Sequence, residues 1–288
     1  MPWATLRGFT FVAGTYALAA AEAVWLPGVL AMERWRQRRW ERRERGSGSW
    51  LNAREAKRFS QFGEDGMLEA LFERVGTANR YFVELGAGDG HENTTRNLAE
   101  AGWTGVWVEA DRPSADEAAR VVGDRGVAVE CATVTPDSAP GILERAGAPA
   151  DLDLLAIDLD GIDYYVWRSL AGSYRPRAVV IEYNAAATPG SRWVQRYRPG
   201  RFWDGSRRFG ASLDALAGLA ETLGYSLVAC ESHGANAFFV RDDVVAERLP
   251  GVETRVSRLY RSPKYFGEHF GHPCRRDRSG LYRYEPRA

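Results

Sequence analysis

A glycine-rich turn follows the apolar run YFVEL, which ends at Leu85. Gly86, Gly88 and Gly90 come next at alternate positions, where glycine permits positive φ and lets a ligand approach the backbone. This spacing differs from the GxGxxG turn that holds a pyrophosphate. Glu84 stands two residues before the first glycine, and its charge would repel phosphate but suit a cationic or amine-bearing ligand.

A second acid, Glu109, ends the next apolar run, 19 residues after Gly90. A carboxylate at that position can accept hydrogen bonds from both hydroxyls of a ribose. S-adenosylmethionine combines the expected features, because it carries an amino group, a sulfonium and a ribose but no phosphate. The turn and Glu109 therefore predict a nucleoside site; the alternative is a glycine turn of some other α/β protein.

Oxygen-bearing side chains gather after two further apolar runs. Asp158, Asp160 and Asp163 follow one run, and Glu182 and Asn184 end the other. The carboxyl ends of parallel strands open on one crevice, where these charges would repel each other unless a cation or protons intervene. Oxygen ligands suit Mg²⁺ or Mn²⁺. The expected metal ligands are Asp158, Asp160, Glu182 and Asn184.

The same region has other interpretations. Asp160, or its neighbour Asp158, can act as a general base without metal, and Asp163 is the most ordinary candidate for a helix cap. His91, next to the glycine turn, is the second candidate base, although a lone histidine there is as often structural. No role is assigned to the histidines that lack an acid partner in the sequence, which are His233, His269 and His272.

Alternating strands and helices must position these residues. The expected strands are 81–85, 105–109, 127–131, 152–159, 178–183, 225–229 and 237–241. The expected helices are 64–75, 94–101, 114–122, 140–146, 164–170 and 212–223. Continuous apolar runs are typical of a sheet covered on both faces, and the alternation predicts a parallel sheet. The closely spaced final strand pair predicts an antiparallel edge.

The chain resembles the FkbM-type S-adenosylmethionine-dependent methyltransferases, or a close branch of them, over roughly residues 59 to 243. The blocks that carry the resemblance are SQFGEDGMLEALF, YFVELGAGDGHENTTRNL, GWTGVWVEAD, LLAIDLDGIDYYVW, AVVIEYN, GASLDALAGLAETLGYSLV and NAFFVRDD. The resemblance implies a Rossmann-like class I methyltransferase fold with a mostly parallel seven-stranded sheet. It also implies O-methylation of a sugar, glycan or natural product.

Carried over by motif, the resemblance implies a methionine-binding turn and a ribose-binding Glu109. The turn residues are Glu84, Gly86, Ala87 and Gly88, and Gln61 and Asp65 of the SQFGED block lie near the cofactor. The arginines and aromatics of residues 185–209 would overhang the acceptor, or else form a solvated loop. Two other function classes stay open: an enzyme that uses a nucleoside or metal without transferring methyl, and a catalytically silent, membrane-tethered binding protein.

Composition limits the partners. The 288 residues carry 38 Lys+Arg and 38 Asp+Glu, which argues against an electrostatic grip of the whole chain on nucleic acid. Cys131, Cys230 and Cys274 form no CxxC pair, so we expect neither a disulfide framework nor structural zinc, and a cytoplasmic location.

The N-terminal segment differs from the rest. Residues 8–32 are largely apolar, and the next residues are rich in arginine, with Trp35 and Trp40 as candidate interface anchors. Residues 8–45 are therefore a candidate for contact with the inner face of the cell membrane, or alternatively a helix packed on protein. The Gly-Ser stretch at 46–49 predicts a boundary between an N-terminal extension, 1–49, and a catalytic domain, 50–288.

Overall fold

The computed structural model describes residues 48–199 and 209–264. Some sequence-based predictions concern residues outside these ranges, including the segment 8–45, His269, His272 and Cys274. The strands are β1 (Tyr81–Leu85), β2 (Thr104–Glu109), β3 (Val127–Cys131), β4 (Leu154–Ile157), β5 (Ala178–Glu182), β6 (Tyr225–Cys230) and β7 (Asn236–Arg241). The helices are η1 (Trp50–Arg54), α2 (Glu64–Val75), α3 (Arg96–Glu100), α4 (Arg112–Val122), α5 (Ala139–Arg145), α6 (Asp163–Leu170), α7 (Leu213–Leu223), α8 (Asp242–Arg248) and α9 (Val256–Leu259).

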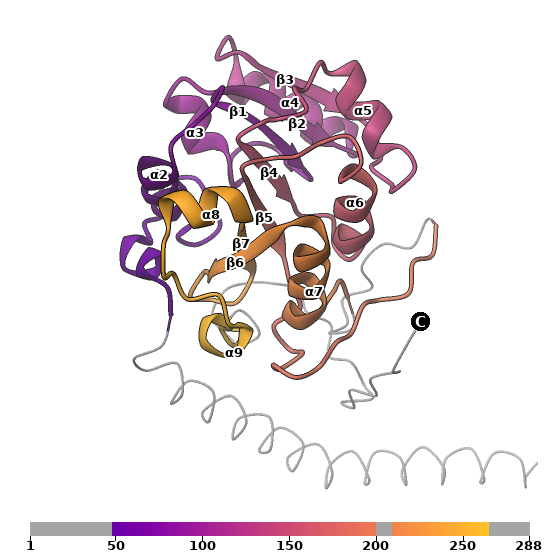
Figure 1. Cartoon of the computed structure of the whole chain (residues 1–288). Helices are drawn as coiled ribbons and strands as arrows, with labels where there is room; N and C mark the ends of the chain where they lie inside the picture. The colour runs from indigo at the N-terminus through magenta and orange to yellow at the C-terminus, as the bar shows by residue number, and fades with distance from the viewer. Residues whose placement is uncertain (1–47, 200–208, 265–288) are drawn as a thin grey trace, which may run out of the picture.

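These strands form one sheet in the order β3-β2-β1-β4-β5-β7-β6 (Figure 1). The first five strands pair in parallel, and β7 is antiparallel to both of its neighbours. The expected α/β class, the seven-stranded sheet and its antiparallel edge are therefore confirmed. This is the strand order and the hairpin edge of the class I methyltransferase fold.

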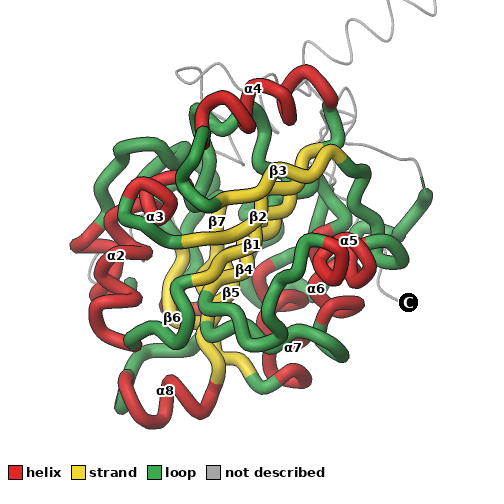
Figure 2. The backbone as a smooth tube through the Cα atoms, turned by 90° about the horizontal axis from the view of Figure 1, so that it is seen from above, coloured by secondary structure: helices red, strands yellow, loops and turns green. Residues whose placement is uncertain are grey.

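Helices cover both faces of the sheet, with α5, α6 and α7 on one side and α2, α3 and α8 on the other (Figure 2). Alternate strand residues serve the two layers, as the pleat requires. Val83 and Leu85 join the core beneath α5, α6 and α7, whereas Phe82 and Trp107 pack into the core beneath α2, α3 and α4. Burial on both faces explains why the strands appear as continuous apolar runs.

The chain changes direction along the sheet between β1 and β4. These strands are parallel neighbours, with Leu85 opposite Ile157, and β2 and β5 flank them on either side. Ligands of open α/β sheets bind at the carboxyl ends of strands at such a switch point. The segments after β1, β2, β4 and β5 all start at this edge, and most of the predicted site residues lie at these strand ends or just after them, whereas Gln61 and Asp65 precede β1.

The first described element, η1, follows the Gly-Ser stretch directly. Ser49 caps η1, since its Oγ accepts the N–H of Leu51 at 3.3 Å, and Leu51 is fully buried. The division into two domains stays a prediction. No helix within 48–199 or 209–264 has the length and apolar character that crossing a membrane requires.

Candidate functional site

The glycine turn is held against the end of β2. The N–H groups of Gly86 and Ala87 both donate to the carbonyl of Val108, at 2.9 and 3.2 Å. Gly86 has φ +87°, and a Cβ there would lie 1.8 Å from the carbonyl oxygen of Asp158. A Cβ on Gly88, at φ +59°, would meet open space. The turn therefore touches the β4 end on one side and leaves room for a ligand at Gly88.

Glu109 lies beside this turn, where the sequence predicted a ribose-binding acid. One carboxylate oxygen accepts the N–H of Gly88 at 2.9 Å, and the other accepts the N–H of Asp111 at 2.8 Å. The half-buried side chain thus links the ends of β1 and β2. The ribose contact itself stays a prediction.

Glu84 has a structural task that the sequence did not reveal. Its carboxyl accepts hydrogen bonds from Asn93 Nδ2 (3.1 Å), Thr94 N (2.8 Å), Thr95 N (3.0 Å) and Thr95 Oγ1 (2.5 Å). Burial raises the pKa of Glu84 to about 7 even though these donors lower it. The side chain orders the loop before α3, and its predicted contact with the methionine end of the cofactor stays a prediction.

The SQFGED block folds over the loop that follows the glycine turn. One oxygen of the fully buried Asp65 accepts three successive backbone N–H groups, those of residues 58–60, at 2.7 to 2.8 Å. Its other oxygen, Oδ1, is buried and has no hydrogen-bond partner within residues 48–199 and 209–264. Lys57 Nζ donates hydrogen bonds to the carbonyl of Gln61 and to the carboxylate of Glu92, which lies in that loop. The block therefore places an unsatisfied carboxylate oxygen near the turn, and the Gln61 side chain is half-buried.

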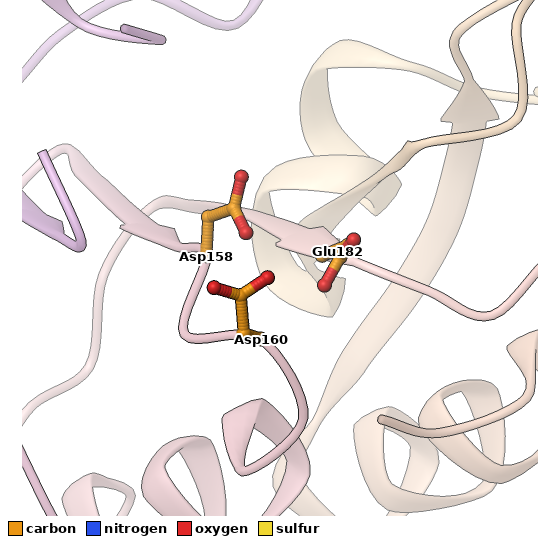
Figure 3. A group of neighbouring side chains, drawn as sticks. All are labelled: Asp158, Asp160 and Glu182. Atoms are coloured by element: carbon orange, nitrogen blue, oxygen red, sulfur yellow. The ribbon is translucent and has the colours of Figure 1, made fainter. Parts of the chain in front are cut away.

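Three acids from the ends of β4 and β5 converge. Carboxylate oxygens of Asp158, Asp160 and Glu182 lie within 4.8 Å of one another, and the side chains point together (Figure 3). Asp160 has φ +54°, which is uncommon for a residue other than glycine and turns the chain back toward β5. The strand-end argument thus predicted this cluster correctly, and we call these three residues the acid cluster.

Burial and mutual repulsion dominate the electrostatics of the acid cluster. Burial raises the pKa of Asp158 well above its usual range, and the nearby Asp163, Asp160, Glu84 and Glu64 raise it further. Burial and then the charges of Asp158, Asp163 and Asp160 raise the pKa of Glu182 in the same way. The Asp158 and Asp160 side chains are nevertheless exposed, so water can reach them. Glu182 Oε2 is buried and has no hydrogen-bond partner in the described part of the chain.

Asp163 and Asn184 hold the backbone around the acid cluster. The Asp163 carboxyl accepts the N–H groups of Leu159 (2.8 Å) and Gly161 (3.0 Å), and burial raises its pKa to about 6. The N-cap of α6 is Ile162, so Asp163 closes the preceding turn instead of capping the helix. The Asn184 amide bonds the Phe209 carbonyl and the Ala186 N–H. Its predicted role as a metal ligand therefore gains no support and stays a prediction.

His91 lies on the β2 side of the site. Its Nε2 is 3.1 Å from a carboxylate oxygen of Glu117 on α4, and both side chains are substantially exposed. The ring thus contacts a surface acid and not the acid cluster. The prediction that His91 is the second candidate base gains no support from this contact.

The loop after β5 packs beside the acid cluster. Val194 pairs with Ala211 in an isolated bridge, and the Gln195 carboxamide accepts the N–H of Gly210 at 3.1 Å. A Cβ on Gly161 would lie 2.8 Å from that carboxamide, so this loop abuts the residue after Asp160. Residues 185–199 therefore lie where an acceptor would meet the cluster, and residues 200–208 are outside the described residues.

Sequence reasoning missed one acid–base pair. His233, which seemed to have no acid partner, forms a contact of 3.2 Å between its Nδ1 and Glu231 Oε2 across the β6–β7 turn. The expectation that His233 lacks an acid partner is wrong, because a tight turn brings residues 231 and 233 together. A Glu-x-His triplet at the end of a predicted strand was the available signal.

Comparison with known proteins gives structural neighbours alone. An O-methyltransferase from Bacillus cereus, solved in complex with SAH, is 17% identical, with 78% of this chain and 95% of that chain covered and a TM-score of 0.42. S-adenosylmethionine-dependent methyltransferases from Clostridium acetobutylicum and Mesorhizobium loti are 10% and 16% identical. The match to the Clostridium protein covers 62% of this chain and 90% of that chain, with a TM-score of 0.40. The match to the Mesorhizobium protein covers 60% of this chain and 95% of that chain, with a TM-score of 0.41.

No family model matches the chain, and no curated protein matches it. The resemblance to the FkbM-type group is therefore not confirmed. The structural neighbours are S-adenosylmethionine-dependent methyltransferases, and likeness at these identities and TM-scores carries no inference about activity or substrate.

Proposed function

We propose that this chain is an S-adenosylmethionine-dependent methyltransferase that methylates a hydroxyl oxygen of a small-molecule or glycan acceptor. One juxtaposition carries the proposal. The open turn at Gly88, with Glu109 bonded to it, lies at the ends of β1 and β2, and the acid cluster lies at the adjoining ends of β4 and β5. The turn that would hold the nucleoside and the acid cluster are therefore neighbours at the switch point of the sheet. The FkbM-type resemblance supports the same function.

Methyl transfer from a sulfonium is an in-line displacement, so the chain must align donor and acceptor. Glu109 and the backbone at Gly88 would hold the nucleoside, and the cationic methionine end would face the buried carboxylates of Glu84 and Asp65. The acceptor oxygen would enter beside Asp158 and Asp160, covered by the loop 185–199. In this arrangement the transferred methyl group would lie over the junction of β1 and β4.

The acid cluster fits a divalent cation. It offers oxygen ligands alone, and among the described residues the buried Glu182 Oε2 finds no partner for the hydrogen bond that such an atom normally makes. When bound, Mg²⁺ or Mn²⁺ would orient the acceptor hydroxyl and lower its pKa. Asp158, Asp160 and Glu182 would hold the ion. Without an ion, Asp160 is the carboxylate placed to take the proton.

Calorimetry with S-adenosylmethionine tests the methyltransferase assignment. We expect saturable binding that S-adenosylhomocysteine competes away. A folded chain that binds neither compound would contradict the proposal and favour an enzyme or binding protein of another class.

Chelation tests the metal. With an ion in the acid cluster, chelator abolishes transfer and lowers the melting temperature, and Mg²⁺ or Mn²⁺ restores both. Transfer at full rate in excess chelator, with no metal found by elemental analysis, would reject the metal and leave a protein group as the base.

A further inference from the structure

The acid cluster belongs to a longer row of polar side chains along the same edge of the sheet. Leu85, Ile157, Ile181 and Ala237 all lie in the core beneath α5, α6 and α7. Because successive strand residues face opposite sides, the residue next to each of them faces the α2 side. These neighbours are Glu84, Asp158, Glu182 and Asn236. The row therefore continues past the acid cluster onto the β6–β7 hairpin.

Contacts connect the row to α2 and to the hairpin. Asn236 lies opposite Glu182 in the β5–β7 ladder, and its Nδ2 donates to Oε1 of the buried Glu64 at 2.8 Å. On its other side, the carbonyl of Asn236 accepts the N–H of Glu231 at 3.0 Å. The turn that follows Glu231 therefore lies at the edge where the acceptor would enter.

Glu231 fixes that turn and one imidazole ring. The carboxylate is fully buried, and it accepts the N–H groups of Ala235 (2.6 Å) and His233 (2.7 Å). The same oxygen that takes the His233 N–H lies 3.2 Å from the ring Nδ1. A buried carboxylate at Nδ1 selects the tautomer with the proton on Nδ1 and leaves the lone pair on Nε2.

The His233 ring is held flat and partly open. It stacks on Phe62 of the SQFGED block, with centroids 4.3 Å apart and planes inclined by 11°. Its side chain is 35% exposed, and its Nε2 makes no hydrogen bond with the described part of the chain. A ring fixed by a carboxylate at Nδ1, with an Nε2 lone pair that no described residue uses, is the geometry of a general base oriented by a carboxylate.

We propose that His233, oriented by Glu231, accepts the proton of the acceptor hydroxyl; this inference rests on the proposed methyltransferase function. As the acceptor oxygen forms its bond to the methyl carbon, the carbon–sulfur bond breaks and its electron pair stays on sulfur. The hydroxyl proton moves to Nε2, and the imidazolium is stabilised by the Glu231 carboxylate. His233 takes the role that the sequence assigned to Asp160, and the acid cluster keeps the task of orienting the oxygen.

The surroundings of the ring set the pH dependence. The hydrogen bond to Glu231 is the largest influence on His233 and raises its pKa above the usual value, whereas desolvation lowers the pKa. The negative charges of Glu231 and Glu55 also raise the pKa, and the positive charge of Lys264 lowers it. Glu55 reaches the hairpin through Ser232, and Lys264 bonds the Ser232 carbonyl. Since a base must be unprotonated, the rate should fall as pH drops through this raised pKa.

The experiment measures transfer of the labelled methyl of S-adenosylmethionine to a panel of sugars, glycosides and small phenols. The variants are His233→Gln, His233→Ala and Glu231→Gln, and the matched control is Glu253→Gln, which removes the charge of a half-buried acid paired with Arg255. We expect kcat of His233→Gln to fall about 100-fold or more with little change in KM. The decrease of kcat at low pH, which is the acidic limb of the pH–rate profile, should disappear in this variant. Imidazole should restore part of the rate of His233→Ala. Glu231→Gln should move the limb to lower pH.

Each result decides the assignment. S-adenosylmethionine binding and the melting temperature of His233→Gln should match the wild type, which separates chemistry from folding. Equal kcat in His233→Gln, an unmoved limb in Glu231→Gln, or no rescue by imidazole would overturn the role of His233 while the methyltransferase assignment stands. A wild-type chain that methylates no compound of the panel would overturn both.

Discussion

The carboxylate of Glu109 has acceptor capacity left after its two backbone contacts. Each oxygen takes one N–H, those of Gly88 and Asp111, whereas an ionised carboxylate offers about four acceptor sites. Two hydroxyls of a ribose can therefore bind without breaking the existing bonds. At the residue scale, this acid both shapes the turn and stays available to a nucleoside.

Replacing Glu109 by Ala should weaken S-adenosylmethionine binding by about 1–3 kcal/mol, the usual loss for hydrogen bonds to a charged group. Calorimetry on the folded variant measures the change. Unchanged affinity would exclude the ribose role.

Asp65 presents the opposite case, because one of its oxygens is satisfied and the other is not. Oδ1 is buried and has no partner in the part of the chain that the structure describes, and the charge of Asp65 contributes to the raised pKa of Glu84. An ammonium group would satisfy Oδ1 and reduce this repulsion. Asp65→Asn should lower the affinity for S-adenosylmethionine about tenfold or more. The affinity for 5′-methylthioadenosine, which lacks the amino acid part, should not change. Equal losses for both ligands would point to a distorted fold instead.

At the scale of elements, the turn after β1 is constrained in two different ways. Gly86→Ala should lower the melting temperature strongly, because a Cβ would overlap the Asp158 carbonyl, which belongs to the backbone. Gly88→Ala should cost only about 1–2 kcal/mol, the penalty of the left-handed conformation, since its Cβ meets open space. Cofactor binding should nevertheless fall in Gly88→Ala. Thermal melts and calorimetry on the pair check this; normal binding by Gly88→Ala would place the ligand elsewhere.

Most of the strands were predictable because they are apolar runs buried on both faces, whereas β3, at the edge of the sheet, is buried only at Val127. The expected strands 81–85 and 127–131 match β1 and β3, and the run 152–159 shortens to β4 because its last residues turn toward the acid cluster. The elements η1, α8 and α9 were missed. All three are short, and α8 buries Val244 alone, so no helical periodicity marks it.

The site was predictable where it depends on strand ends and unpredictable where it depends on turns. Parallel pairing brings Asp158 and Glu182 together whatever the loops do. The backbone contacts of Asn184 and the Glu231–His233 pair arise from local chain reversals, and the Phe62 stack joins distant segments. Spacing of residue types carries no information about such contacts.

At the scale of the whole molecule, the body should fold without residues 1–47. The η1 region is tied to the β6 end, since Asn52 Nδ2 donates to the Cys230 carbonyl at 2.8 Å and Glu55 accepts the Ser232 N–H at 2.9 Å. A chain beginning at Gly48 should keep a cooperative melt and its cofactor affinity. A chain beginning at Lys57 should lose stability, because the β6–β7 hairpin loses these contacts. Insolubility of the first chain would show that the N-terminal segment belongs to the core.

The excess of buried acids makes stability depend on pH in an unusual direction. Burial raises the pKa of Glu84 from 4.5 to about 7 and that of Asp163 from 3.8 to about 6, so the folded chain holds these protons more tightly than the unfolded chain. The raised pKa of His233 acts in the same sense. The free energy of unfolding should therefore fall as pH rises from about 4.5 to about 7.

The acids with lowered pKa do not reverse this trend. The hydrogen bond to Arg255 lowers the pKa of Glu253 to about 2. The ionised Glu253 therefore contributes stability that is lost only as pH falls below about 4.5. We expect the melting temperature of the ligand-free chain, measured in chelator, to drop by several degrees between pH 5 and pH 8, since about 1 kcal/mol moves it by roughly 2–4 °C in a domain of this size. S-adenosylmethionine or Mg²⁺ should flatten the curve, because a bound cation stabilises the ionised carboxylates. A melting temperature that rises steadily to pH 8 without ligand would show that these acids are already compensated within the protein.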